Sequence, residues 1–209
     1  MIEKYFIRGA RFKWNCPSAV TTGSKDGSII NSPPMPAASL VYDGMDGELQ
    51  GAVHPASVGL TMGKSIPYQW LVYSHGHTTR RMLSAGDVLT GPMSGCLISE
   101  WSEKGMRWVG HVGTVESSAA INKKVKSNFG MALPTQARGF YPDKAWSVAE
   151  ISSMQQKFKV YPQMQIMALV TANGKFYSIV MFKISAAEWC VGGIKAVQPL
   201  SAVQMRAKL

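Results

Sequence analysis

The chain alternates apolar and polar residues over many short stretches, a pattern typical of strands with one buried face. Two such stretches, residues 166–171 and 176–182, flank Asn173-Gly174, a pair that supplies the positive φ angles of a tight turn. They are therefore predicted to form a β-hairpin. Further strands are expected over residues 3–14, 39–42, 69–73, 97–101, 106–115 and 189–197.

Helical patterns are fewer. Residues 117–129 carry apolar side chains at every fourth position, and Gly130 stands where a helix commonly ends. Ser147 and Glu150 have the spacing of a capping box, which predicts that a second helix begins there. About eight strands and two helices without a βαβ rhythm indicate an α+β fold. We expect a single domain over residues 1–209, a mostly antiparallel β-sandwich flanked by a few helices.

The distribution of charge adds to this picture, because the net positive charge is concentrated in the second half of the chain. Residues 1–102 hold eight basic and seven acidic side chains, a net charge of +1, whereas residues 103–209 hold fourteen and five, a net charge of +9. A basic half indicates an anionic partner, and an acidic protein surface is the expected one. Nucleic acid is the less favoured partner, because no RNA- or DNA-binding signature is present.

Several classes of protein are excluded by what the sequence lacks. No apolar run reaches the roughly 18–20 residues that a membrane-spanning helix needs, and the charged N-terminal residues do not form a secretory signal. The chain contains no phosphate-binding glycine loop and no nucleophile elbow. His75-x-His77 is the one close histidine pair, but it lacks a third ligand nearby, so no metal is expected.

One cysteine of the three has unusual neighbours. Cys96 follows Ser94-Gly95 and precedes an apolar strand. Gly95 leaves room beside the sulfur for a substrate carbonyl. The backbone N–H of Cys96, together with a neighbouring amide, would then donate to an oxyanion. Cys16 and Cys190 are interpreted as packing residues.

The hairpin that Cys96 opens brings a histidine toward it. With the turn at residues 103–105, residue 96 should face about residue 112, next to His111. A neighbouring imidazole can take the thiol proton and hold the thiolate. Its other nitrogen needs an acceptor, for which a carbonyl at residues 90–91 is one candidate. A buried cysteine beside a core histidine without chemistry remains the alternative.

The arrangement Thr90-x5-Cys96-x14-His111, with Ser94-Gly95-Cys96 at its centre, resembles the cysteine–histidine glutamine deamidases. This family includes the catalytic domains of the cytotoxic necrotizing factors, the Burkholderia lethal factor and the CheD chemoreceptor deamidases. The resemblance covers residues 90–111. It implies a β-sandwich wrapped by helices, with Cys96 as nucleophile, His111 as general base and then acid, and Thr90 as the residue that orients His111.

The implied activity is deamidation of a glutamine side chain in a target protein, without a cofactor. The resemblance to the toxin branches further implies a bacterial effector that acts in the cytosol of a target cell, or in the cytoplasm if it is not exported. Two alternatives remain. The same Cys–His pair serves cysteine peptidases and transglutaminases, and the basic half alone would suit a binding module without catalysis.

Overall fold

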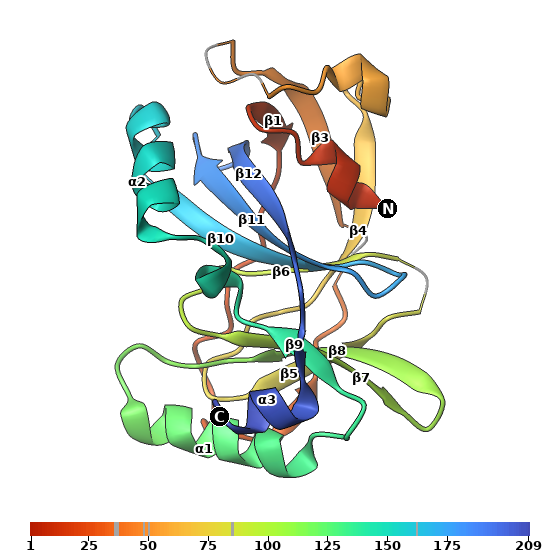
Figure 1. Ribbon diagram of the computed structural model, residues 1–209, viewed down its shortest axis with the longest axis vertical. Helices are drawn as coiled ribbons and strands as arrows, with labels where there is room; N and C mark the ends of the chain where they lie inside the picture. Colours follow the sequence, from red (N-terminus) through yellow and green to blue (C-terminus); the bar gives the residue numbers. More distant parts are fainter. Residues whose placement is uncertain (36–37, 48, 50, 85, 162) are drawn as a thin grey trace.

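The computed structural model describes residues 1–35, 38–47, 49, 51–84, 86–161 and 163–209. Over these residues the fold is α+β, with mostly strands and three short α-helices. The strands form two mixed sheets, one above the other in Figure 1. The first sheet, in spatial order, contains β1 (Ala10–Lys13), β12 (Glu188–Val197), β11 (Phe176–Lys183), β10 (Gln163–Val170), β6 (Val88–Thr90), β4 (Ser65–Trp70) and β3 (Ala38–Met45).

The first sheet closes into a seven-stranded barrel, so the prediction of a plain sandwich is wrong. Closure occurs because β1 pairs with β12 on one side and with β3 on the other. Such closure removes the unpaired edges that an open sheet would expose. The two sheets are also mixed, since β4 runs parallel to β6 in the barrel and β2 runs parallel to β5 in the second sheet. The interior of the barrel is aromatic, with Trp14 in ring contact with Tyr68, Trp70 and Trp189.

The second sheet is open and carries helices on its outer face. Its strands, in spatial order, are β13 (Leu200–Ser201), β9 (Arg138–Phe140), β7 (Leu97–Glu103), β8 (Met106–Val112), β5 (Thr78–Met82) and β2 (Ile29–Asn31), the last of which is parallel to β5. The helices α1 (Ala119–Ala132) and α3 (Ala202–Arg206) lie beneath this sheet, whereas α2 (Val148–Lys157) lies beside the barrel (Figure 1). Val125 and Phe129 of α1 pack with Leu97 and Val112 of the sheet.

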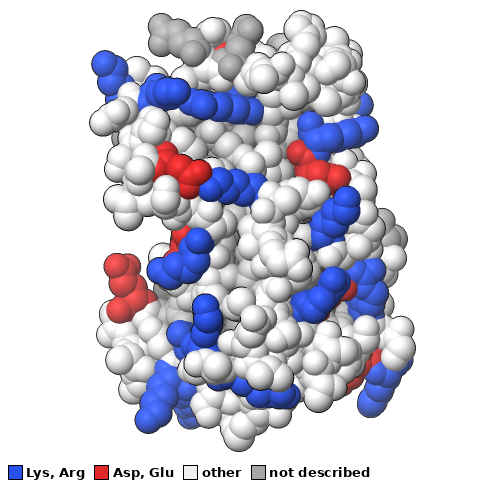
Figure 2. Space-filling model, viewed as in Figure 1, with Lys and Arg blue, Asp and Glu red and all other residues white. Residues whose placement is uncertain are grey.

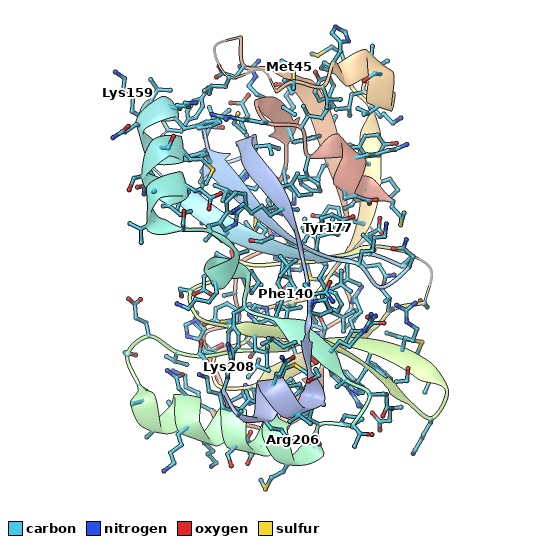
Figure 3. The ribbon with its side chains drawn as sticks, viewed as in Figure 1. Met45, Phe140, Lys159, Tyr177, Arg206 and Lys208 are labelled. Atoms are coloured by element: carbon cyan, nitrogen blue, oxygen red, sulfur yellow. The ribbon has the colours of Figure 1, made fainter. Side chains whose placement is uncertain are left out.

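The inner face of the second sheet packs against the barrel. Ile98 and Phe140 of this sheet share one buried cluster with Leu71, Ala168 and other residues of the barrel side. Phe140 lies at the boundary between the two sheets in Figure 3. Leu97 and Ile98 are consecutive residues, so they occupy opposite faces of β7, and Ile98 belongs to the inner face. The residue two positions before Ile98 along the chain is Cys96, which joins the same inner cluster.

The two predicted hairpins and the capping box are confirmed. The capping box at Ser147 has both of its hydrogen bonds. Other boundaries differ: Gly130 does not end α1, which continues to Ala132. Residues 3–14 are not one strand, because a 3₁₀ helix, η1 (Ile2–Tyr5), precedes β1. The strand predicted over residues 69–73 ends at Trp70.

A buried carboxylate connects the two sheets. Glu100 on β7 is 6% exposed and pairs with Arg107 on β8 and with Arg138 on β9. The two guanidinium groups also donate to the carbonyls of Ala172 and Gly174, in the turn between β10 and β11. This cluster therefore fixes the position of the second sheet relative to the barrel.

The surface carries its charges in a dispersed pattern. On the face in Figure 2, Lys and Arg side chains are spread with Asp and Glu between them, and no single patch stands out. In the part of the chain that the structure describes, no helix combines the length and the apolar character needed to span a bilayer.

Candidate active site

Cys96 and His111 lie on the same face of the second sheet. Ile98 of β7 pairs with His111 of β8, so the register differs by one residue from the predicted one. Cys96 precedes Ile98 by two residues and shares its inner cluster. It is therefore the diagonal neighbour of His111, and such neighbours are about 7–8 Å apart at Cα. Side chains as long as those of Cys and His can meet across this separation.

Thr90 fixes the orientation and the tautomer of His111. The Thr90 hydroxyl donates to the Leu71 carbonyl oxygen at 2.8 Å, and its oxygen is 2.8 Å from Nδ1 of His111. A hydroxyl has a single proton, so its oxygen must accept from Nδ1–H. This leaves the lone pair of the imidazole on Nε2. The side chain of Thr90 thus supplies the acceptor for which a carbonyl at residues 90–91 had been the candidate.

Nε2 of His111 is buried, and its lone pair is not engaged in a hydrogen bond with any described residue. The imidazole ring stacks on Tyr73, with 4.8 Å between ring centroids and 13° between planes. Burial lowers the pKa of His111 from 6.5 to about 3, so the ring is neutral at physiological pH. A neutral imidazole with a free lone pair at Nε2 is a proton acceptor.

Cys96 is also buried, at 1% exposure, and its sulfur is hydrogen-bonded to Thr114 rather than to His111. The Sγ–Oγ1 distance is 3.3 Å. Burial raises the pKa of the Cys96 thiol, while hydrogen bonds from Thr114 and Ser94 act in the opposite direction. The thiol and the imidazole are therefore both neutral in this state. The thiolate–imidazolium ion pair expected from the sequence is not formed in this structure.

The backbone before the sulfur is open to an approaching group. Gly95 has a φ of +81°, and no atom lies within 4 Å of the place where a Cβ would stand. Nothing among the described residues accepts a hydrogen bond from the Cys96 N–H, which leaves that donor free for an oxyanion. The glycines around His111 have another role. A Cβ on Gly110 would collide with Trp101, and one on Gly113 with the Ser74 carbonyl.

Three residues near the site were not found from the sequence. The Tyr73 hydroxyl donates to the Thr114 carbonyl, so one side chain both stacks on His111 and holds the segment that contacts the sulfur. The pKa of Cys96 is raised mainly by burial, and the charge of Asp143 adds to that direction. These residues come from separate segments that only the tertiary structure brings together, and no local pattern marks them.

His75 also lies against the Tyr73 ring, with 4.9 Å between ring centroids, so His111 is not the sole histidine beside this tyrosine. Nε2 of His77 is 3.5 Å from an Asp26 oxygen, and Nδ1 is 3.3 Å from the Ser74 hydroxyl. Cys16 is partly buried, and Cys190 is buried in the barrel wall. Across the described residues, no three His, Cys, Asp or Glu side chains form a group that could hold a metal ion.

A hollow in the surface lies near these segments. In Figure 2 it opens at the left edge, at the level where the turn between β9 and α2 faces the loop that precedes α1. That turn contains a 3₁₀ helix, η3 (Pro142–Ala145), which includes Asp143. The loop before α1 includes Thr114.

Comparison with known proteins adds no relative. No protein-family model, no curated protein and no solved structure matches the chain. Function is therefore inferred from the geometry of Thr90, His111 and Cys96 and from the resemblance of their spacing.

Proposed function

We propose that the protein is a cysteine-dependent amidohydrolase that converts a glutamine side chain of a target protein to glutamate. The observation that carries this proposal is a chain of two hydrogen bonds. Nδ1–H of His111 donates to the Thr90 hydroxyl, which donates to the Leu71 carbonyl, and this leaves a neutral imidazole with its lone pair on Nε2. This is the tautomer that a general base requires, and it lies on the same sheet face as Cys96.

In the first half of the reaction the thiol proton moves to Nε2 of His111, and the sulfur attacks the carboxamide carbon. The carbonyl oxygen becomes an oxyanion, which the Cys96 N–H can stabilise. His111 then returns the proton to the departing nitrogen as the carbon–nitrogen bond breaks. Ammonia leaves, and an acyl group remains on Cys96 as a thioester.

In the second half, His111 takes a proton from water, whose oxygen attacks the thioester carbon. The carbon–sulfur bond breaks, the sulfur recovers its proton from His111, and the glutamate side chain is released. An amine in place of water would give transglutamination. The sulfur must first turn from the Thr114 hydroxyl toward Nε2, because the thiol and the imidazole are not hydrogen-bonded to each other in this structure.

The substrate class follows from the resemblance and from charge. The cysteine–histidine deamidases act on proteins, and the fourteen basic side chains of residues 103–209 would attract an acidic target surface. Such steering raises the association rate and weakens with salt. By the same resemblance, we propose that the protein is a bacterial effector that acts in the cytosol of a target cell.

The decisive experiment incubates the protein with a cell lysate and searches for peptides in which a glutamine has gained the mass difference between NH₂ and OH. The wild type and Cys16→Ser should produce the same modified peptide, whereas folded Cys96→Ser and His111→Ala should not. Intact peptide bonds together with ammonia release exclude a peptidase. Modification by folded Cys96→Ser at the wild-type rate would refute the proposal.

A second candidate is a basic binding module without catalysis. The burial of Cys96 and its raised pKa favour this alternative, because a buried thiol is ordinarily inert. It predicts that the iodoacetamide reactivity of Cys96 resembles that of an ordinary buried thiol, and that the protein is retained on polyanions with a steep dependence on salt.

A further inference from the structure

Asp143 has one satisfied and one unsatisfied carboxylate oxygen. Oδ2 is 3.1 Å from Nζ of Lys144, an exposed side chain. Oδ1 is buried and has no hydrogen-bond partner among the described residues. A buried carboxylate oxygen without a donor is costly. Such an atom calls for a donor that the described residues do not supply.

The ladder between β7 and β9 brings this carboxylate close to Cys96. Ile98 pairs with Phe140 at the end of this antiparallel ladder, so Cys96 and Pro142, each two residues beyond that pair, both continue from the same end of it. Asp143 is the next residue of the chain, and its charge acts on the Cys96 thiol. The turn that carries Asp143 also borders the hollow in Figure 2.

The turn is held in place from both sides. The Ser178 hydroxyl on β11 donates to the Pro142 carbonyl at 2.8 Å, and the same hydroxyl accepts from Nε1 of Trp146 at 2.7 Å. Because Pro142 and Trp146 flank Asp143 in sequence and bind the same serine, the carboxylate is fixed relative to the barrel. A fixed acceptor can impose geometry on a bound group.

The unpaired groups of the site define the ligand that they would accept. His111 Nε2 and Asp143 Oδ1 are both buried acceptors without a donor. The thiol of Cys96 can satisfy the first when the sulfur turns toward it. The second requires a donor from outside the protein. A primary carboxamide carries two N–H donors on the atom that leaves in deamidation, whereas an ester or a carboxylate carries none.

We propose that Asp143 is the specificity-determining residue that binds the carboxamide nitrogen of the substrate. Its Oδ1 accepts a hydrogen bond from the glutamine NH₂ group, which orients the leaving group opposite the attacking sulfur. This inference rests on the proposed deamidase function. After hydrolysis the product carries a carboxylate where the amide stood, and the like charge of Asp143 disfavours its retention. One residue would thus select the amide and promote release of the acid.

The test uses alkylating probes of Cys96 in the full-length protein. Iodoacetamide carries the NH₂ group, its N,N-dimethyl analogue is neutral but has no N–H donor, and iodoacetate carries the product-like charge. The rate for each probe is measured by mass spectrometry of the Cys96 peptide and divided by the rate with free glutathione. The variants are Asp143→Asn, Asp143→Leu and the control Asp43→Leu. Asp43 is similarly half-buried and similarly paired with an exposed lysine, but lies on the barrel strand β3.

In the wild type and in Asp43→Leu, the normalised rate should favour iodoacetamide over both other probes. In Asp143→Leu the preference for iodoacetamide over the dimethyl analogue should fall about tenfold. The preference of Asp143→Asn should lie between those of the wild type and Asp143→Leu, since asparagine keeps an acceptor oxygen. Asp143→Asn should also react faster with iodoacetate than the wild type does, because it loses the negative charge. An unchanged preference in Asp143→Leu, no preference in the wild type, or no alkylation of Cys96 by any probe would each overturn the inference.

These outcomes are separate from the lysate assay of the proposed function. If the wild type prefers iodoacetamide through Asp143 but modifies no glutamine, the amide-binding site stands and the deamidase proposal fails. If the wild type modifies glutamine and Asp143→Leu keeps the probe preference, the deamidase proposal stands and the role of Asp143 fails.

Discussion

Thr90→Val should destabilise the protein and remove the proposed activity, because one hydroxyl satisfies two buried groups. Valine has nearly the shape of threonine, so packing is retained while the hydroxyl is lost. The Leu71 carbonyl then loses its donor, and Nδ1–H of His111 loses its acceptor. Thr90 and His111 are both fully buried, so water does not replace the missing partner without rearrangement.

The expected magnitude follows from these two losses. A buried polar group left without its partner costs about 1–3 kcal/mol, so the free energy of unfolding should fall by about 2–6 kcal/mol for the two groups together. The imidazole would also lose the contact that selects its tautomer. With a proton on Nε2 it can no longer accept the thiol proton, and loss of the correct tautomer in another hydrolase costs about 10⁴ in rate.

The assay is urea unfolding of wild type, Thr90→Val and a matched control, Thr78→Val. Thr78 is fully buried on the neighbouring strand β5, but its hydroxyl has no partner among the described residues. The same substitution should therefore leave the stability unchanged or raise it. Thr90→Ser should restore both stability and turnover of the modified glutamine. Equal stability of the two valine variants, or a Thr90→Val enzyme with wild-type turnover, would refute this reasoning.

Three further outcomes are expected. Because burial lowers the pKa of His111 from 6.5 to about 3, the unfolded chain binds the extra proton between these values. Urea titrations should then show wild-type stability falling, relative to His111→Gln, by about 1.4 kcal/mol per pH unit below about 6.5, and equal slopes would contradict this. Glu100→Gln should cost about 3 kcal/mol in urea unfolding, because two guanidinium groups lose a buried partner. Glu103→Gln, in an exposed pair, should cost less than about 1 kcal/mol, and similar losses would argue against a role for burial. Gly95→Ala and Gly105→Ala both place a side chain at positive φ with open space around it, so each should lose about 1–2 kcal/mol. Only Gly95→Ala should also slow alkylation of Cys96, and an equal effect of Gly105→Ala would show that the approach to the sulfur is not at Gly95.

The sequence predicts the local parts of the site well because those parts depend on neighbours in the chain. The hairpin that carries His111 opposite the start of β7 follows from its turn at Lys104-Gly105, and its register was wrong by one residue. A shift of this size decides whether Cys96 and His111 lie on the same face of the sheet or on opposite faces. Turn geometry sets the register, and the sequence does not specify that geometry closely enough to choose.

The long-range parts could not be predicted, since they depend on how the sheets pack. Barrel closure requires β1 to pair on both sides, and nothing in residues 10–13 indicates two partners. The short strand β6 lies among turn residues, but it carries Thr90 to Leu71 and His111. Asp143 reaches the site only because β9 pairs with β7. Such pairings bring together residues far apart in sequence, which local periodicity cannot reveal.

Two residues of the candidate site lie in strands and two lie in the adjoining loops, which indicates how the buried sulfur could become accessible. Thr90 and His111 are held in strands on facing sheets, so both side chains have little freedom. Cys96 precedes β7, and its hydrogen-bond partner Thr114 follows β8, so both lie just outside the ladder. Movement that exposes the sulfur therefore has to come from these two flanking segments. A rotation of the thiol side chain, away from the Thr114 hydroxyl, would then bring the proposed nucleophile toward the proposed base without disturbing either sheet.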